Sequence, residues 1–170
     1  WTDDAQALKN SVARAVSGGP IYVSDQLQRS HSDILYPLAL SDGRILRCDR
    51  PAVPTADCVC TDPTVSGEPI KIKNTVNESG VLALFNLDKE NRKVTGSISP
   101  SDIPELDGEE FVVYSHFDKT AKILKRNETM NVSLDDNDAV ELYIIVPYRN
   151  GFAAIGRTDK FISPATILTV

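Results

Sequence analysis

The pattern that decides the fold lies in residues 70–85, which read IKIKNTVNESGVLALF. Hydrophobic and charged residues alternate strictly over Ile70–Lys73, which is the period of a strand with one buried face. Asn77, Glu78 and Gly80 then favour a tight turn, and Val81–Leu87 returns as an apolar run. The stretch therefore predicts an antiparallel β-hairpin.

The chain beyond this hairpin repeats the pattern of strand and turn. Short runs rich in β-branched and aromatic residues follow one another, with turn-forming residues between them. Asn150-Gly151 is a type I′ turn signal between the last two runs. The expected strands are Lys93–Ser99, Glu110–Phe117, Ala121–Arg126, Asn131–Leu134, Ala139–Pro147 and Phe152–Ile155. Strands of this length and spacing predict an all-β antiparallel sandwich.

The N-terminal part of the chain has a different pattern. Residues 3–17 predict a helix whose apolar face includes Leu8 and Val12, and which Gly18-Gly19 ends. Pro20–Asp25 is a short apolar run with polar residues at its C-terminal end, typical of a buried parallel strand. Residues 32–40 predict a second short helix, and residues 44–47 a short strand. Helix, parallel strand and helix form one increment of an α/β architecture.

These patterns divide the chain into three segments. Residues 1–48 hold the α/β increment, and residues 70–170 the all-β domain. Residues 49–69 predict an extended linker, because four prolines interrupt any regular element there: Pro51, Pro54, Pro63 and Pro69. The chain starts at Trp1 and enters a helical pattern almost at once, so we expect it to be a piece of a longer protein.

The composition limits the kinds of partner. The chain has 170 residues, of which 41% are hydrophobic and 25% charged, as in ordinary globular proteins. Its formal net charge of -6 argues against nucleic acid and anionic membranes, which need concentrated Lys and Arg. No apolar run approaches the ~18 residues that span a bilayer, and no signal peptide is visible. The charge suits a neutral ligand such as a sugar.

Cysteines and sequons bear on the compartment. Cys48, Cys58 and Cys60 form neither a disulfide framework nor a usual zinc site, so we expect free thiols in a reducing, cytoplasmic environment. Three N-x-[S/T] sequons begin at Asn77, Asn127 and Asn131, and such tripeptides arise often by chance. The acidic run at residues 135–138 lacks the ligand spacing of a calcium loop and predicts a solvated turn.

Few residues suggest chemistry. The two histidines, His31 and His116, lie in no nucleophile–base pattern, and His116 is expected at a surface or edge. No metal site or cofactor loop is predicted. One constellation remains, since Tyr22, Ser24 and Asp25 occupy the C-terminal end of the predicted parallel strand, where α/β barrels place their sites. Asp25 accepts hydrogen bonds from sugar hydroxyls or orients a catalytic group; alternatively, it caps the next loop or forms a salt bridge with it.

Several stretches, in one order along nearly the whole chain, resemble the raffinose synthase / alkaline α-galactosidase (seed imbibition protein-like) group of family 36 glycoside hydrolases. The most specific is residues 13–25, ARAVSGGPIYVSD, which resembles a late-barrel motif of that group. Weaker similarities follow in DGRILR at 42–47, PTADC at 54–58, IKIKN at 70–74, GVLALFN at 80–86, and AIG and SPA near 154–165. The resemblance implies that residues 1–48 are the end of a (β/α)8 catalytic barrel and contain its last βα unit.

The resemblance also implies an activity. Members are retaining α-galactosidases or α-galactosyltransferases acting on raffinose-type or melibiose-type α-galactosides, with one carboxylate as nucleophile and another as acid/base. Both carboxylates lie on earlier barrel strands, so no catalytic residue is expected in this chain. Tyr22, Ser24 and Asp25 are the expected substrate-binding residues. Hydrolase and transferase activities both stay open.

Two other functions compete with this one. The β region is either a carbohydrate-binding module, against which the scarcity of aromatic residues speaks, or a structural domain that packs on the barrel. A single α/β increment should also leave apolar surface around Leu8, Val12, Ile21 and Val23. The expected partners are therefore the remainder of the same enzyme or a second copy of the chain.

Overall fold

The predicted hairpin forms part of the central sheet in the computed structural model, which describes residues 1–168. Strand β2 (Ile70–Val76) pairs in antiparallel register with β3 (Ser79–Phe85), Ile70 opposite Phe85 and Val76 opposite Ser79. The two turn residues, Asn77 and Glu78, have φ angles of 47° and 61°. Positive φ at both positions matches the right-handed twist of the strands, as in a type I′ turn.

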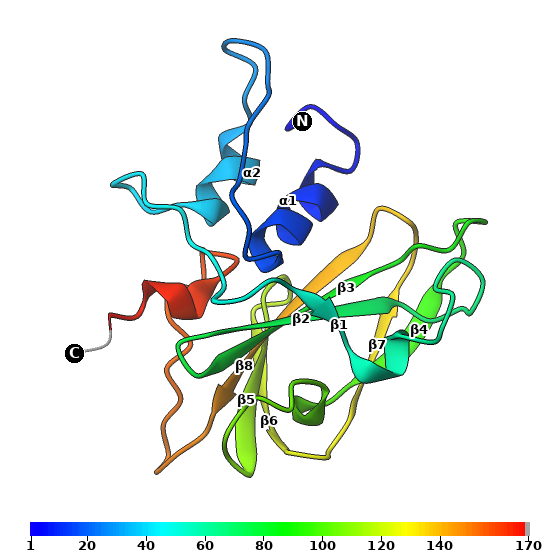
Figure 1. The fold of residues 1–170 in the computed structure, drawn as a ribbon, viewed down its shortest axis with the longest axis vertical. Helices are drawn as coiled ribbons and strands as arrows, with labels where there is room; N and C mark the ends of the chain where they lie inside the picture. Colours follow the sequence, from blue (N-terminus) through cyan, green and yellow to red (C-terminus); the bar gives the residue numbers. More distant parts are fainter. Residues whose placement is uncertain (169–170) are drawn as a thin grey trace.

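Six antiparallel strands form the main sheet, in the order β1-β2-β3-β8-β5-β6 (Figure 1). Strand β8 lies between β3 and β5, and the short β1 and the exposed β6 form the two edges. The remaining bounds are β1 Val53–Pro54, β5 Glu110–Ser115, β6 Thr120–Lys125 and β8 Val140–Pro147. The chain is thus mostly antiparallel β-sheet with few helices, as residues 70–170 predicted.

A second, two-stranded sheet covers one face of the main sheet. It pairs β4 (Val94–Ile98) with β7 (Met130–Leu134). Its inner side chains, among them Val94, Ile98 and Leu134, join Leu82, Leu84 and Ile145 of the main sheet in one buried cluster. Each aliphatic side chain buried in this way stabilises the fold by about 1.5–3 kcal/mol. We call this two-stranded sheet the β4–β7 ribbon.

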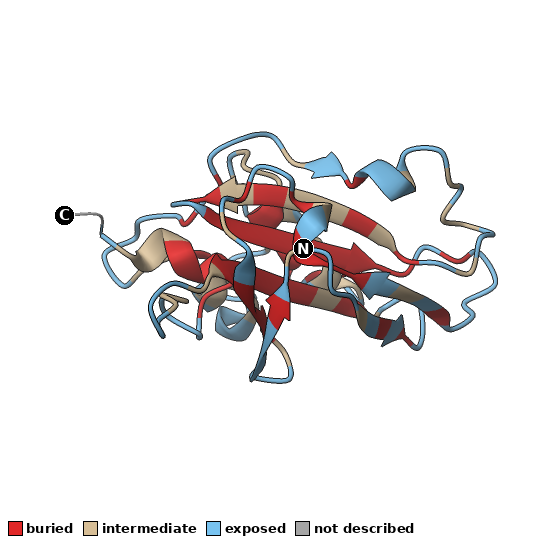
Figure 2. Ribbon diagram, turned by 90° about the horizontal axis from the view of Figure 1, so that it is seen from below, coloured by how far each residue is buried: buried red, intermediate tan, exposed pale blue. Residues whose placement is uncertain are grey.

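Helical segments cover the opposite face of the main sheet. Helix α1 (Ala7–Val16) buries Val12, Ala15 and Val16 against β3 and β8. The chain between residues 35 and 48 and the C-terminal segment around Phe161 complete this cluster. The short elements are α2 Ser32–Leu35, η1 Tyr36–Leu38, η2 Ala56–Cys58, η3 Pro100–Asp102 and η4 Ser163–Thr166. The sheet therefore carries a hydrophobic core on each face (Figure 2).

The run Pro20–Asp25 differs from its prediction, because it forms no strand in the structure. Tyr22 is 77% exposed and Val23 49% exposed. A parallel strand needs neighbouring strands to satisfy its backbone groups, and residues 1–168 place none beside this run. The segment lies instead in an extended loop that projects beside α1 and α2 (Figure 1).

Three further expectations are modified. The helix predicted at residues 32–40 ends as the 3-10 turn η1, since Pro37 and the chain reversal limit it. Arg44–Arg47 and Phe152–Ile155 are not strands and contribute one isolated bridge each, Ala39 with Ile45 and Arg149 with Phe152. The Asn150-Gly151 turn itself has the predicted positive φ angles, 53° and 80°.

Apolar exposure at the N-terminal segment is smaller than expected. Val12 is fully buried against the sheet, while Leu8 is 40% exposed and Ile21 half-buried. The helix therefore uses its apolar face within this chain. The loop after Gly19 has three exposed apolar side chains, those of Tyr22, Val23 and Leu27.

Candidate functional site

Asp25 lies at the centre of a small hydrogen-bonded cluster. One of its carboxylate oxygens accepts from the backbone nitrogens of Trp1, at 2.5 Å, and Thr2, at 2.8 Å. The other accepts from the Thr2 hydroxyl at 2.6 Å, and that hydroxyl oxygen accepts from the His31 backbone N–H at 3.0 Å. The Asp25 side chain is only 3% exposed. Its carboxylate therefore ties residues 1–2 to the loop that follows Pro20.

These contacts fix the charge of Asp25. The amino group of Trp1, and then the hydroxyl and amide of Thr2, hold the pKa of Asp25 well below its usual range. A carboxylate that accepts several hydrogen bonds is ionised and rigid. Both of its oxygens are engaged by Trp1 and Thr2, so the geometry favours a positioning role over open contact with a ligand.

Tyr22 and Ser24 behave differently from Asp25. Both side chains are exposed, and the Tyr22 carbonyl accepts from the indole N–H of Trp1 at 2.8 Å. The guanidinium of Arg14 lies 4.3 Å from the centre of the Trp1 ring and stacks on it. The three residues predicted as a binding site thus lie together, with Asp25 turned inward and Tyr22 and Ser24 turned outward.

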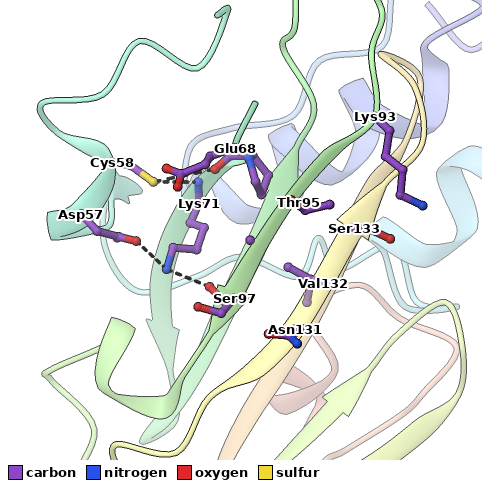
Figure 3. Close-up of a pocket in the computed structure, with 12 residues that line it drawn as sticks. Asp57, Cys58, Glu68, Lys71, Lys93, Thr95, Ser97, Asn131, Val132 and Ser133 are labelled. Carbon is purple, nitrogen blue, oxygen red and sulfur yellow. Dashed lines mark hydrogen bonds and ion pairs between the residues drawn. The ribbon is translucent and has the colours of Figure 1, made fainter. Parts of the chain in front are cut away.

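A second candidate site is a hollow of about 690 Å³ between the segment after β1 and the outer face of the β4–β7 ribbon (Figure 3). On one side lie Asp57, Cys58 and Lys71, and on the other lie the polar side chains of the ribbon: Thr95, Ser97, Asn131 and Ser133. No pattern in the sequence pointed to this hollow, because its walls come from segments distant along the chain. We call it the ribbon groove.

Lys71 organises the floor of the ribbon groove. Its ammonium group donates to the Ser97 carbonyl at 3.1 Å and to both carboxylate oxygens of Asp102 at 3.0 Å. It also pairs with Asp57 at 2.8 Å. Burial opposes the charge on Lys71, but the hydrogen bonds to Asp57 and Asp102 outweigh it and raise its pKa. The lysine is therefore a buried, fully partnered cation.

His116 and Glu141 carry unusual environments that the sequence did not reveal. His116 is 5% exposed and packs against Phe117 and Phe161, so the prediction of a surface histidine is wrong. Burial lowers its pKa to about 4, which keeps the ring neutral at pH 7. Burial, with a smaller contribution from Asp118, raises the pKa of Glu141 to about 7.

Other sequence features take structural roles. Cys48, Cys58 and Cys60 are free thiols, as predicted. The Asn77 side chain donates to the Pro164 carbonyl at 2.9 Å, so it joins the hairpin turn to η4. In the acidic run, an Asp136 oxygen accepts from the N–H groups of Asp138 and Ala139, as in a turn. Over the described part of the chain, none of the helices has the length and apolar character required for a membrane span.

The chain is thus a mainly antiparallel β protein with a helical layer, an anchored N-terminal loop and a polar groove. Comparison of its sequence with known families identifies the family. The chain belongs to the family described as raffinose synthase or seed imbibition protein Sip1, whose model matches residues 3–169. This agrees with the resemblance seen in residues 13–25 and in the later stretches.

Three relatives illustrate the match. A galactinol–sucrose galactosyltransferase of Oryza sativa subsp. japonica is 37% identical, over 88% of this chain and 23% of that protein. One from Pisum sativum is 34% identical, over 74% and 19%. A stachyose synthase of Pisum sativum is 26% identical, over 98% and 23%. The chain thus spans about a quarter of the length of the curated relatives it matches.

Among solved structures, a Bacillus halodurans protein described as an α-N-acetylgalactosaminidase aligns with 47% of this chain and 18% of its own. The sequence identity is 17% and the TM-score is 0.38.

Proposed function

We propose that this chain is the C-terminal portion of an enzyme that acts on α-galactosides with retention of configuration, as a galactosyltransferase or an α-galactosidase. The family match along residues 3–169 carries this proposal. The relatives named above as galactinol–sucrose galactosyltransferases and stachyose synthase support galactosides as the substrate class. The two catalytic carboxylates of a retaining mechanism lie outside these residues in this proposal.

The proposed division of labour follows the three segments. Residues 1–48 supply the last βα unit of a (β/α)8 barrel, residues 49–69 connect, and residues 70–170 form a β-sandwich domain that packs on the barrel. Pro20–Asp25 becomes a parallel strand in this proposal once neighbouring barrel strands satisfy its backbone. The exposed apolar side chains of Val23 and Leu27 then contact the remainder of the same enzyme. Free thiols are consistent with a cytoplasmic location.

Within this proposal Tyr22 and Ser24 contact the galactoside, and Asp25 positions them. The support is geometric, because Tyr22 and Ser24 are exposed on the loop that the Asp25 carboxylate anchors. Aromatic rings and hydroxyls on such a loop can stack on a sugar face and hydrogen bond to its hydroxyls.

Galactosyl transfer tests this function. A longer protein that carries this chain should transfer galactose from galactinol to sucrose, or hydrolyse an aryl α-galactoside. We expect Asp25→Asn to lower kcat/KM by about tenfold, because an amide has a single oxygen, whereas the carboxylate uses one oxygen to accept from the Thr2 N–H and the other to accept from the Thr2 hydroxyl. Asp33→Asn, an exposed carboxylate in α2, is the matched control and should leave kcat/KM unchanged. Robust turnover by the 170 residues alone would overturn the proposal.

A structural role for residues 60–170 is the second candidate. It is favoured by the two hydrophobic cores, which lie on opposite faces of the main sheet and occupy the faces that a flat ligand would otherwise contact. Deletion of the β4–β7 ribbon should then lower the thermal stability of the longer enzyme, without altering the substrate preference of the molecules that remain folded.

A further inference from the structure

We propose that the ribbon groove binds a neutral carbohydrate through hydrogen bonds, with the β4–β7 ribbon as the recognition surface. The inference rests on the proposed function only for the choice of a galactose-containing probe. The hydrogen-bonding groups and the ion pairs that support the inference all belong to this chain. The hollow of about 690 Å³ falls within the ~300–1,000 Å³ of small-molecule sites.

The outer face of the ribbon presents a small grid of hydrogen-bonding groups. Thr95 lies directly opposite Ser133, and Ser97 opposite Asn131. All four side chains are exposed, while Val94, Ile98 and Val132 of the same strands face the core. Cross-strand neighbours are about 5 Å apart and residues two apart on a strand about 7 Å apart. Hydroxyl and amide groups at this spacing can each meet a different sugar hydroxyl.

The opposite wall adds a fixed acceptor. One oxygen of Asp57 accepts from the Thr55 hydroxyl at 2.6 Å, and the other pairs with Lys71 at 2.8 Å. The hydrogen bonds from Lys71 and Thr55, against the opposing effect of burial, lower the pKa of Asp57. The Asp57 side chain is nevertheless 58% exposed at the rim. A held, ionised carboxylate with remaining lone pairs is a good acceptor for two sugar hydroxyls.

The charges around the groove exclude an anionic ligand. Lys71 is paired with Asp57 and Asp102, and Lys93 is paired with Asp135 at 2.7 Å. Both lysines that line the groove therefore already have carboxylate partners. A phosphate or sulfate would have to displace one of these pairs, whereas a neutral polyhydroxylated ligand keeps them intact.

The lining also sets the strength of binding. Among the described residues no aromatic side chain lines the groove, so no ring stacks on the sugar, and hydrogen bonds alone contribute. Such bonds give modest net affinity, because each replaces one with water. We therefore expect dissociation constants in the millimolar range.

The test is a titration of the ¹⁵N-labelled 170-residue chain with stachyose, followed by amide chemical shifts. We expect saturable shifts at β4 and β7, around Gly96 and Val132. The double variant Thr95→Val/Asn131→Ala removes one group from each strand and should weaken binding by about tenfold. Both residues are exposed, so the fold should survive.

Controls separate this site from a general effect. Thr120→Val/Asn127→Ala makes the same chemical changes at exposed positions outside the groove and should bind stachyose within a factor of about two of the unmodified chain. Maltotetraose shows whether galactose matters: equal binding of both sugars still supports a carbohydrate site, even where galactosyl transfer fails. Sulfate is titrated in parallel. The proposal is overturned if neither sugar shifts the amides of β4 and β7, or if only sulfate shifts them. It is also overturned if the Thr95→Val/Asn131→Ala variant binds stachyose as tightly as the unmodified chain.

Discussion

Glu141 is a residue whose environment should make stability depend on pH. One of its carboxylate oxygens is buried without a hydrogen-bond partner among residues 1–168. Its pKa rises from an ordinary value near 4.5 to about 7. The folded state thus holds the proton more tightly than the unfolded chain. This contribution to stability is fully present below about pH 4.5 and is lost as pH rises through 7.

Glu141→Gln removes this dependence. We expect the variant to be more stable than the unmodified chain at pH 8 by about 1–2 kcal/mol, since partial exposure screens part of the effect, and nearly equal at about pH 4.5. Urea unfolding at the two pH values measures the difference. Glu109→Gln, at an exposed position, is the control and should show no such trend. Equal stability of Glu141→Gln and the unmodified chain at the higher pH would refute the assignment.

Lys71 is the second residue with a sharp prediction. Lys71→Met leaves Asp102, only 14% exposed, and the Ser97 carbonyl without their cation. We expect a loss of about 2–4 kcal/mol in the free energy of unfolding. Lys93→Met breaks an exposed pair with Asp135 and should cost under about 1 kcal/mol. Similar losses in the two variants would show that Lys71 is not the organising cation.

At the scale of elements, the end of α1 is held by a close backbone approach. Gly18 has φ 73°, and a Cβ there would lie 2.0 Å from the Arg50 carbonyl oxygen. The Asn74 amide donates to the Val16 carbonyl at 2.8 Å and to the Arg50 carbonyl at 2.6 Å. The helix, the linker and β2 therefore meet at one point, where a side chain on residue 18 cannot fit.

Gly18→Ala should be strongly destabilising for this reason. We expect a loss of at least about 3 kcal/mol, from the positive φ and from the displaced Arg50 backbone. Gly43→Ala is a matched control, because Gly43 has φ 85° but no atom lies within 4 Å of the position that a Cβ would occupy there. It should cost about 1 kcal/mol. Thermal unfolding of the two variants separates the cost of the positive φ, which both share, from the cost of the contact with the Arg50 backbone, which only Gly18→Ala has. Equal shifts in Tm would show that the contact with Arg50 costs nothing.

Some of the structural elements could be predicted from the sequence, and others could not. The β2–β3 hairpin and most later strands follow from alternation and turn residues, which are local signals. The pattern of Pro20–Asp25 predicted a strand that the structure does not contain, because an apolar run becomes a strand only beside other strands. The alternation Ile70-Lys71-Ile72-Lys73 predicted a strand with one buried face, yet in the structure Lys71 is also buried, beneath the ribbon. That burial depends on where β4 and β7 fold back, which no nearby residue signals.

On the scale of the whole molecule, α1 and the main sheet share one core. Val12, Ala15 and Val16 pack with Val81, Leu142 and Ile144. Amides of α1 and β3 should therefore show similar protection from hydrogen exchange, and both should open only with global unfolding. Amides of residues 20–30 should exchange fast. Mass-spectrometric hydrogen exchange measures this, and early opening of α1 alone would show that the helix is a separate unit.

The candidate sites at this scale differ in how predictable they were. Tyr22, Ser24 and Asp25 lie close together in a motif that resembles a known family, so they could be selected from the sequence. The ribbon groove joins Asp57 to Asn131 across many intervening residues, and only the fold brings them together.

The position of the segment before β2 has one more consequence. Two outward backbone groups of β4 already have partners, because the Thr95 N–H donates to the Gly67 carbonyl at 3.0 Å and the Ser97 carbonyl accepts from Lys71. An unpaired strand edge can pair with a strand of another chain. Here the buried Lys71 and the proline-containing segment before β2 occupy part of the β4 edge, so another chain cannot pair with it there. The same contacts that shape the groove thus guard this side of the protein against edge-to-edge aggregation.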